Sequence, residues 1–521
     1  MKILKNIYVI PAIITFVLIL LLFVEQVNEK TSFPSEGWSR SISFNEVSDG
    51  RTYFISTNEN GSFEAYTPAD NELLHLTINE DLEVTNKEII PVELHKRKDF
   101  WAKDNDVIYL DEQKNLVLFS NGKNAVISEN VNGASFDENT ILFWDNKSIY
   151  FVDSESYKVT KVAETEKPIK DLLIDKDSKS FVVVFNIDPS VFDIAYYFHD
   201  TNVYIPVYSG ELVTHLGATL TDLAFVDENE KLHFVYTAIT RRQGVRKSKT
   251  NYLTVDVRSK EVKTEPLVIL DSENNRPLSD PGDFELFSRN SQVKLLFSAN
   301  GFLDKRTMEG SIYEAVNNDG KWIAERRSTT YKHSLRPEVV NDETIVWLDF
   351  YPQLTFSEEE YRFYASSSRT EVIKHTESVT GADLKIATSA MLTALPKSVF
   401  ILFFAFLWIV PPVLILMTLA FVNPKHIEKT SWKVRITSVV LLVISQYFVM
   451  SKINASVFNI AAPDYLTFAY SMLVYASVLG IVSFMVMMFV RTEDWSPSVE
   501  FIYIACINAW FISLLYGSYL L

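Results

Sequence analysis

The sequence predicts an all-β domain made of repeated four-strand units, flanked by helices that cross a membrane. Two observations carry this prediction. One long apolar run lies near the N-terminus and four more lie in the C-terminal quarter. Between them, short runs rich in Val, Ile, Tyr and Phe are separated by turn residues such as Asn60-Gly61 and Asn121-Gly122, a pattern typical of consecutive hairpins.

The N-terminal run covers Ile7–Val24, follows Lys2 and Lys5, and carries no charge. A helix of about 18 apolar residues is long enough to cross a bilayer. A secretory signal peptide would have a shorter apolar region and a small-residue cleavage site, and neither is found before Asn28. We therefore expect an uncleaved anchor with residues 1–6 as a cytoplasmic tail.

Four further spans are predicted, and the charges between them set the orientation. Short loops rich in Lys and Arg mark the cytoplasmic side, and here these are residues 423–435 and 491–500. The N-terminus is then inside, and the large domain and the C-terminus are outside. The predicted spans are Val399–Val422, Ile436–Ile460, Tyr465–Val490 and Phe501–Leu521. Little protein remains in the cytoplasm, so no internal enzyme domain is expected.

Charge and cysteine content limit the classes of function. Residues 30 to 395 hold 40 of the 49 Lys and Arg residues but 59 of the 66 Asp and Glu residues. An acidic domain argues against nucleic-acid binding, which needs clustered positive charge. The only cysteine is Cys506, in the last span, so the external domain has no disulfide. Exported domains often use disulfides, and their absence suggests a bacterial source.

The external domain, residues 30–378, is predicted to be a β-propeller of about seven blades, with six or eight as alternatives. Radial repetition of four antiparallel strands hides most strand edges without disulfides. Earlier units are expected to start near Ser41, Trp101, Ser135 and Asp171, and strand material in Leu82–Leu94 has no assigned place. A pair of β-sandwiches is the alternative fold. The three clearest units are Leu223–Val226, Leu232–Ile239, Tyr252–Val257 and Val262–Leu270; then Phe284–Phe287, Val293–Phe297, Ser311–Val316 and Lys321–Glu325; then Glu338–Val340, Thr344–Asp349, Phe363–Ser366 and Glu371–His375.

With runs such as Ile149-Tyr150-Phe151-Val152-Asp153, about two-thirds of the chain resembles the general class of membrane-anchored extracytoplasmic β-propellers. No Trp-Asp or kelch signature repeats, so the resemblance points to no specific family.

Residues 379–396 break the strand pattern. Leu384, Ile386, Met391 and Leu395 fall near helical spacing, so we expect a juxtamembrane helix that ends at Pro396. It would be a stalk or would transmit strain to the bundle.

Two segments are candidate binding sites. Five positive charges, Arg241, Arg242, Arg246, Lys247 and Lys249, lie within nine residues. On an acidic domain, such a hairpin loop would grip an anionic wall polymer, lipid headgroups or an acidic partner, or it would simply be a solvated loop.

The second candidate is the long link from Asn186 to Asn202, which contains Tyr196, Tyr197 and His199. Long loops on a repeat scaffold often carry binding residues. The competing interpretation, which we favour, is a buried strand over Ile194–Phe198.

Enzyme and metal motifs are incomplete. Ser120-Asn121-Gly122-Lys123 lacks the companion elements of penicillin-recognising enzymes, and Asp175-Lys176-Asp177-Ser178 lacks the glycine and distal glutamate of a calcium loop. We predict no catalytic residue, no metal and no cofactor.

The leading hypothesis is a non-enzymatic multi-pass protein of the cell membrane, whose external domain binds a protein partner or surface ligand as a scaffold, adaptor or sensor. Its expected contacts are the lipid bilayer and either a membrane or cell-surface protein or an anionic wall polymer, with no nucleic acid. The alternatives are a permease-like subunit of a transport complex and a surface hydrolase of glycan or peptide. The hydrolase would show carboxylates clustered at the mouth of the propeller channel.

Overall fold

A computed structural model describes residues 7–58, 61–94, 98–176, 178, 180–188, 191–200, 203–213, 218–228, 230–242, 245–302, 308–318, 320–352, 359–422, 431–452, 458, 462–492 and 495–520. These residues form two compact units. The propeller unit runs from Phe33 to Ser378, and the helical unit contains the described residues before Phe33 and after Ser378.

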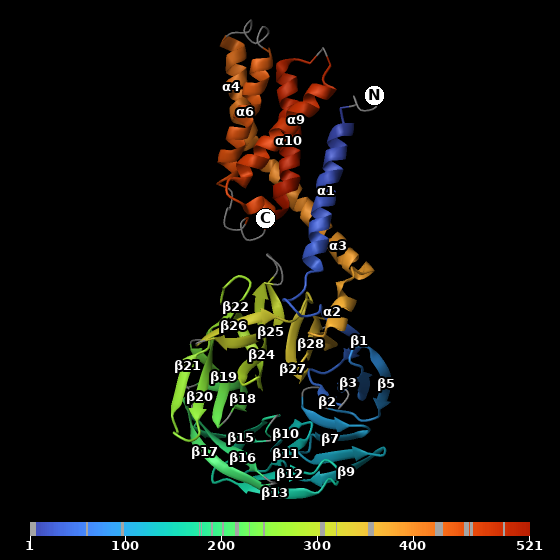
Figure 1. The fold of residues 1–521 in the computed structure, drawn as a ribbon, viewed down its shortest axis with the longest axis vertical. Coiled ribbons are helices and arrows are strands. Elements are labelled where there is room, and N and C mark those ends of the chain that lie inside the picture. The colour runs from blue at the N-terminus through green and yellow to red at the C-terminus, as the bar shows by residue number, and fades with distance from the viewer. Residues whose placement is uncertain are drawn as a thin grey trace. The chain divides into compact units, whose positions relative to one another are not determined.

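Seven sheets arranged around one axis make up the propeller unit (Figure 1). This confirms the predicted β-propeller with seven blades and excludes the β-sandwich pair. From inner to outer strand, the blades are β2 (Phe54–Thr57), β3 (Phe63–Ala69), β4 (Glu72–Ile78), β5 (Val84–Ile90); β6 (Phe100–Lys103), β7 (Asp106–Leu110), β8 (Leu116–Ser120), β9 (Lys123–Ser128); β10 (Gly133–Asp137), β11 (Thr140–Trp144), β12 (Ser148–Val152), β13 (Val159–Glu164); β14 (Ile169–Ile174), β15 (Phe181–Asp188), β16 (Val191–Asp200), β17 (Val203–Val213); β18 (Ala218–Glu228), β19 (Lys231–Arg242), β20 (Val245–Asp256), β21 (Val262–Pro266); β23 (Ser279–Arg289), β24 (Gln292–Phe302), β25 (Met308–Asn318), β26 (Lys321–Arg326), with β22 (Ile269–Asp271) outside; and β27 (His333–Asn341), β28 (Thr344–Pro352), β29 (Glu359–Ser367), β1 (Ile42–Ser48).

The ring closes with strands from both ends of the domain. The outer strand of the seventh blade is β1, which pairs antiparallel with β29. The prediction of a fourth strand at Glu371–His375 was therefore wrong. Those residues lie in helix α2 (Thr370–Glu377), which buries Val372 and Thr376, one helical turn apart.

Two other strand assignments change. Because β1 belongs to the last blade, the first blade does not start near Ser41 but at Phe54. The strand material in Leu82–Leu94 is β5, the outer strand of that first blade.

The blade topology defines two faces of the propeller. In an up-and-down blade, the chain crosses to the next blade at the face where the inner strand begins, and the hairpin between strands two and three lies on the same face. We call this the crossover face. The other face carries the remaining hairpins, such as the turn after β14.

Polar side chains link neighbouring blades in place of disulfides. The hydroxyl of Tyr157 donates to the Asp106 carboxylate, and that of Tyr196 donates to Asp227. At the end of the ring, Arg40 donates to the carbonyl oxygens of Thr376 (2.6 Å) and Ser378 (2.8 Å). A guanidinium suits the carbonyls that end a helix, so this contact fixes α2 to the start of the domain.

The helical unit contains a central helix, α10, surrounded by others. Within the described residues, five helices are long and apolar enough to cross a membrane, one N-terminal and four C-terminal, which supports membrane association. The helices are α1 (Val9–Lys30), α3 (Gly381–Ile401), the short 3-10 turn η2 (Leu402–Phe404), α4 (Phe406–Val422), α6 (Ser431–Met450), α8 (Asp464–Thr467), α9 (Ser471–Val490) and α10 (Pro497–Leu520).

Pro396 does not end the juxtamembrane helix, which corrects the sequence-based boundary. Helix α3 starts with a capping box between Thr380 and Asp383 and continues through Pro396 to Ile401. Proline is tolerated in membrane helices because neighbouring groups satisfy the freed backbone carbonyl. The predicted loop 423–435 lies mostly outside the described residues.

Candidate ligand-binding site

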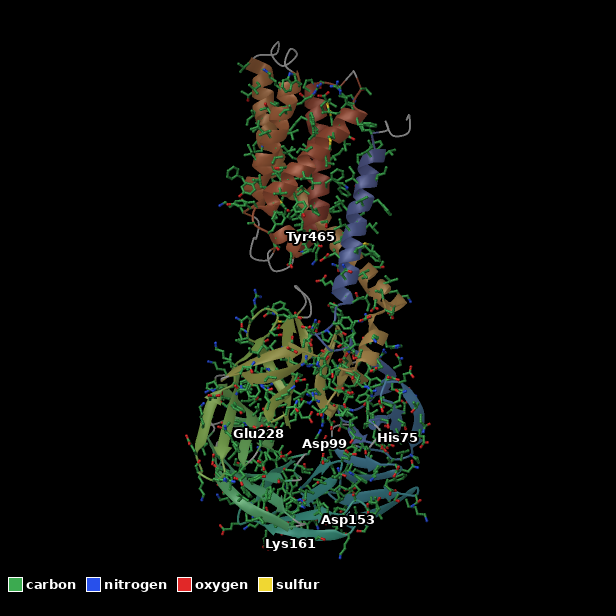
Figure 2. All side chains as sticks on the ribbon, viewed as in Figure 1. His75, Asp99, Asp153, Lys161, Glu228 and Tyr465 are labelled. Carbon is green, nitrogen blue, oxygen red and sulfur yellow. The ribbon has the colours of Figure 1, made fainter. Side chains whose placement is uncertain are left out.

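The inner strands of the blades enclose a central channel with two overlapping cavities of about 400 and 460 Å³. Both cavities are lined by a mixture of polar, charged and apolar residues of the inner strands and the turns beside them. Asp99 lies toward the centre of the ring, whereas Lys161 lies near its rim (Figure 2). The channel is therefore not filled by an apolar core.

Six charged side chains converge where the channel opens on the crossover face. We call this set the channel mouth, and its members come from six of the seven blades and their connections. They are Arg51, Asp99, Asp171, Asp222, Asp283 and Arg336.

Half of the channel mouth is a closed ion-pair network. Arg51 donates through Nη2 to both carboxylate oxygens of Asp283, at 2.9 and 3.1 Å. Arg336 donates through Nη2 to Asp99 Oδ1 at 2.9 Å and through its backbone N–H to Asp283 Oδ2 at 3.1 Å. The Thr52 hydroxyl also donates to Asp99. Both guanidinium groups are thus already neutralised.

The other half of the channel mouth, Asp171 and Asp222, has no cationic partner within ion-pair distance among the described residues. Asp171 accepts from the Leu172 N–H at 2.9 Å. Both side chains are exposed to the solvent of the channel.

Local backbone geometry aims these residues inward. The inner strands β14, β18, β23 and β27 each have a register shift beside Asp171, Asp222, Asp283 and Arg336, respectively. The last three have positive φ, between 48° and 50°, a conformation that is uncommon outside glycine. Bulges often re-aim side chains next to functional sites.

The channel walls shift the acidity of these groups. Removal from bulk water raises the pKa of Asp171, against smaller lowering effects of the Leu172 N–H and the Lys170 charge, and nearby Asp99 adds to the rise. The pKa of Asp222 is raised by the same desolvation and by Asp283, against a smaller lowering by Arg51. A bound cation would favour the charged form of both carboxyls and oppose these shifts.

A cation crosses the channel below the mouth. Lys176 lies in the turn after β14, and its Nζ is 2.7 Å from Glu285 Oε1 and 2.8 Å from Glu338 Oε1. Desolvation raises the pKa of Glu285, and Glu338 raises it further, while Lys176 opposes both. These three residues are among those that line both cavities, so the Lys176 bridge lies where the cavities overlap.

The channel mouth was not predicted from the sequence, although the sequence contains a signal for it. Four of its aspartates directly precede an apolar residue of an inner strand, as Asp99-Phe100, Asp171-Leu172, Asp222-Leu223 and Asp283-Phe284. The return of this dipeptide in four of the seven blades would have placed four carboxylates at similar positions of their inner strands.

The predicted basic segment is the tip of the β19–β20 hairpin, in which Arg241 pairs with Arg246 along the backbone. Arg246, Lys247 and Lys249 are exposed, while the side chains of Arg241 and Arg242 lie outside the described residues. As a hairpin between strands two and three, it lies on the crossover face, the same face as the channel mouth. Its binding role stays a prediction.

The second predicted site is not a loop. Residues Val191–Asp200 form strand β16, and Tyr196 and Tyr197 are only 2% and 8% exposed. His199 is partly buried and lies 4.9 Å from the Tyr204 ring, measured between ring centroids. The aromatic side chains of this strand pack between blades, as the favoured interpretation of a buried strand predicted. The binding role of Tyr196, Tyr197 and His199 stays a prediction.

A metal site is not supported by the geometry of the described residues, since no group of three His, Cys, Asp or Glu side chains is arranged to hold an ion. Asp175 accepts from the Ser178 hydroxyl at 2.9 Å, as in an ordinary turn.

Comparisons with known proteins place the chain in no family. No family model matches it, and no curated protein matches it. Among solved structures it is similar to the WD40 domain of Neurospora crassa Pan2, with 12% identity and a TM-score of 0.37, over 64% of this chain and 96% of that domain. The fold assignment rests on the seven sheets.

Proposed function

We propose that this chain is a multi-pass membrane protein whose propeller recognises a partner or ligand at the channel mouth, through a cationic group of that ligand. The observation that carries the proposal is the unequal charge of the mouth. Four carboxylates face two guanidinium groups, and among the described residues neither Asp171 nor Asp222 has a cation within ion-pair distance. An amine or guanidinium entering the channel would form charge-assisted hydrogen bonds with both.

The basic hairpin fits the same scheme as a second contact on the crossover face. A partner that offers a cationic group to the channel and an acidic patch to Arg246, Lys247 and Lys249 would be oriented by both signs of charge. Such complementarity gives specificity and a fast association rate more than raw affinity. An adaptor or receptor role follows from this arrangement.

For topology, we propose that the N-terminus is cytoplasmic and that the propeller and the C-terminus are extracytoplasmic. The support is the placement of Lys and Arg in residues 1–6, 423–435 and 491–500. Accessibility of a C-terminal tag from outside the cell tests it. A cytoplasmic C-terminus would favour the alternative of a transport subunit.

The binding proposal is tested by calorimetric titration of the full-length protein in detergent. The probe is a tri-lysine peptide, and its fully acetylated form is the neutral comparison. We expect Asp171→Asn with Asp222→Asn to weaken binding by about tenfold, since one such factor corresponds to ~1.4 kcal/mol. Glu83→Gln with Glu261→Gln is the matched control, because it changes the net charge equally at exposed sites away from the channel.

Equal weakening by both double variants would mean that the probe senses only the overall acidity of the domain, and it would refute the proposed site. No binding of the lysine peptide to the unchanged protein would refute the cationic ligand.

A surface hydrolase is the second candidate function. The feature that the sequence analysis set as its signature, carboxylates clustered at the channel mouth, is present in the structure. The raised pKa of Asp222 would suit a general acid. Turnover of a glycan or peptide substrate that is lost in Asp222→Asn would establish this activity. Binding without turnover would leave recognition as the function.

A further inference from the structure

We infer that the membrane-spanning bundle contains an internal hydrated site, in which Gln446 of α6 and Asn508 of α10 bind water. Both side chains are fully buried, with exposures of 0%. None of their four amide nitrogen and oxygen atoms has a hydrogen-bond partner among the described residues. The inference is independent of the function proposed for the propeller.

The amides require partners because of their surroundings. A buried polar group that makes no hydrogen bond is costly, and hydrocarbon offers no alternative partner. Most buried polar groups in proteins are paired with protein or with ordered water. Two carboxamides at such a site therefore point to a small molecule that both donates and accepts hydrogen bonds, and water is the smallest.

An ion pair at one end of the bundle sets the relative depth of the two helices. Glu500, near the start of α10, accepts from Arg435 Nε at 2.5 Å and Nη2 at 2.9 Å. It also lies 3.3 Å from Arg491 Nη1, just after α9. Both α6 and α10 begin at this end, so their residues can be compared turn by turn.

Gln446 lies on the face of α6 that carries the ion pair. It follows Arg435 by eleven residues, which is three helical turns and about 16 Å. The buried stripe of α6 agrees with this placement, since it consists of Ser438, Leu442, Gln446 and Met450. Asn508 follows Glu500 by eight residues, or about 12 Å. The two amides therefore differ in depth by about one helical turn.

Helix α9 closes the third side of this junction with small residues. A Cβ added to Gly480 would lie 2.8 Å from Cγ2 of Val443 on α6, so the two helices touch closely one turn below Gln446. The buried Ser483 hydroxyl donates to the Leu479 carbonyl at 2.7 Å. Small residues at such interfaces are typical of membrane helices, and packing this close favours a ligand no larger than water.

Cysteine accessibility tests the site, because Cys506 is the only cysteine. In the full-length protein carrying Cys506→Ser, each of Gln446→Cys, Asn508→Cys and Leu442→Cys is exposed to a small water-soluble methanethiosulfonate. Leu442 is the control, since it is equally buried and lies one turn away on the same face. We expect the first two to react at least about tenfold faster, because only the hydrated thiolate reacts.

A second measurement tests the inference independently, in case a cysteine variant misfolds. Gln446→Leu and Asn508→Leu should have coupled, non-additive effects on the thermal midpoint in detergent, because groups that share one water form a network. Equal, slow reaction of all three cysteines, or additive midpoints, would overturn the inference.

Discussion

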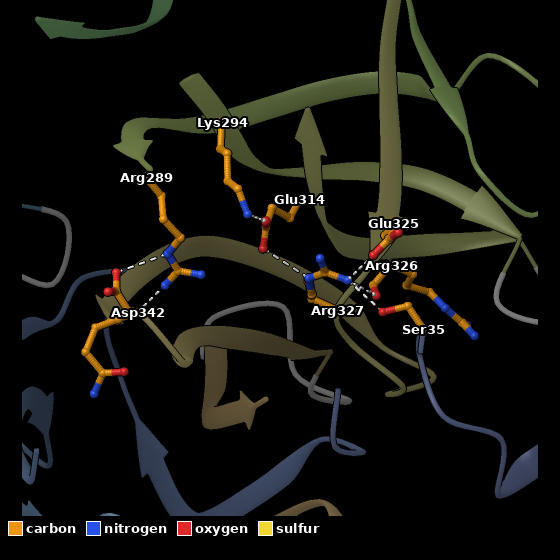
Figure 3. A network of polar contacts seen from close by, with 9 residues as sticks. Ser35, Arg289, Lys294, Glu314, Glu325, Arg326, Arg327 and Asp342 are labelled. Carbon is orange, nitrogen blue, oxygen red and sulfur yellow. Dashed lines mark hydrogen bonds and ion pairs between the residues drawn. The ribbon is translucent and has the colours of Figure 1, made fainter. Parts of the chain in front are cut away.

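The propeller and the bundle each bury one glutamate between two cations. One cation of the bundle is far more exposed to solvent than its counterpart in the propeller. In the propeller, Glu314 is 2.6 Å from Lys294 Nζ and 3.1 Å from Arg327 Nε (Figure 3). In the bundle, Glu500 is held by Arg435 and Arg491. The side chain of Arg327 is 6% exposed, whereas that of Arg491 is 37% exposed.

The difference lies in where a cation can go when its partner is lost. Arg327 also donates to Ser35 at 2.6 Å and to Glu325 at 3.0 Å, and it stacks on Trp38 at 4.6 Å from the ring centroid. These contacts hold it inside the protein (Figure 3). A cation at the end of a membrane helix can extend to the interface. We therefore expect the loss of the glutamate to lower the stability of the propeller more than that of the bundle.

The largest effect should follow from Glu314→Leu. Burial alone raises the pKa of the Glu314 carboxyl, but Arg327 and Lys294 outweigh it and hold the pKa below its usual range. Removing the carboxylate leaves two cations without this partner, one of them almost fully buried, and should cost about 3–5 kcal/mol. Thermal or denaturant unfolding of the propeller measures it.

Glu325→Gln is the matched control at the same arginine. The Glu325 side chain is 51% exposed, and an exposed ion pair contributes less than about 1 kcal/mol. Equal losses in the two variants would contradict the importance of burial.

A pH effect is expected at Asp349, which is fully buried in the seventh blade. Burial raises its pKa to about 6, although the Ser334 hydroxyl and the Trp347 indole N–H donate to it. A raised pKa means that the folded state holds the proton more tightly. Stability from this group is thus present below pH ~4 and lost as the pH rises to ~6.

Asp349→Asn removes this dependence. The free energy of unfolding of the variant relative to the unchanged protein should increase by about 3 kcal/mol between pH 4 and pH 7, which is the pKa difference converted at 1.36 kcal/mol per unit. A pH-independent difference between the two proteins would show that Asp349 titrates normally.

The bundle should respond less to the equivalent change at Glu500. Glu500→Leu should lower its stability in detergent by roughly 1–2 kcal/mol, the scale of interhelical polar contacts. A loss of stability as large as that of Glu314→Leu would contradict this expectation, because it would show that Arg435 and Arg491 cannot move to other positions.

At the channel mouth, the affinity for the lysine peptide should fall as the pH is lowered from 7 toward 5. The pKa values of Asp171 and Asp222 are raised. Protons therefore compete with the cation for these carboxylates at a higher pH than they would at ordinary carboxyl groups. The Asn double variant should lose most of this dependence. A pH profile that survives in it would place the titrating groups elsewhere.

The smallest effect should come from the basic hairpin. Neutralising Arg246, Lys247 and Lys249 should change the stability by less than about 0.5 kcal/mol, because all three residues are exposed. Loss of a partner in co-purification from native membranes would support a docking role. Retention of the partner would confine recognition to the channel mouth.

The sequence predicted the local features of both regions. Seven blades and five candidate membrane helices follow from strand and apolar periodicity. Ring closure by β1 did not follow, since pairing between residues about 320 positions apart leaves no local mark. Pro396 was misjudged because a soluble-helix rule was applied to a helix that is long and apolar enough to cross a membrane.

The candidate site was harder to predict for a related reason. Asp99, Asp171, Asp222 and Asp283 are far apart in the chain, and only the closed ring makes them neighbours. Conversely, the sequence places Tyr196 and Tyr197 in a long link between strands, where exposed aromatic side chains would suggest binding. The packing of the blades buries both side chains.

The most direct test of recognition at the channel mouth is photo-crosslinking in native membranes. A photoreactive residue placed at Ser135, which lines the channel, is compared with one at Val126, which is 57% exposed on the outer strand β9. We expect an adduct from Ser135 that the lysine peptide competes away and no adduct from Val126. An adduct from Val126 with none from Ser135 would contradict it.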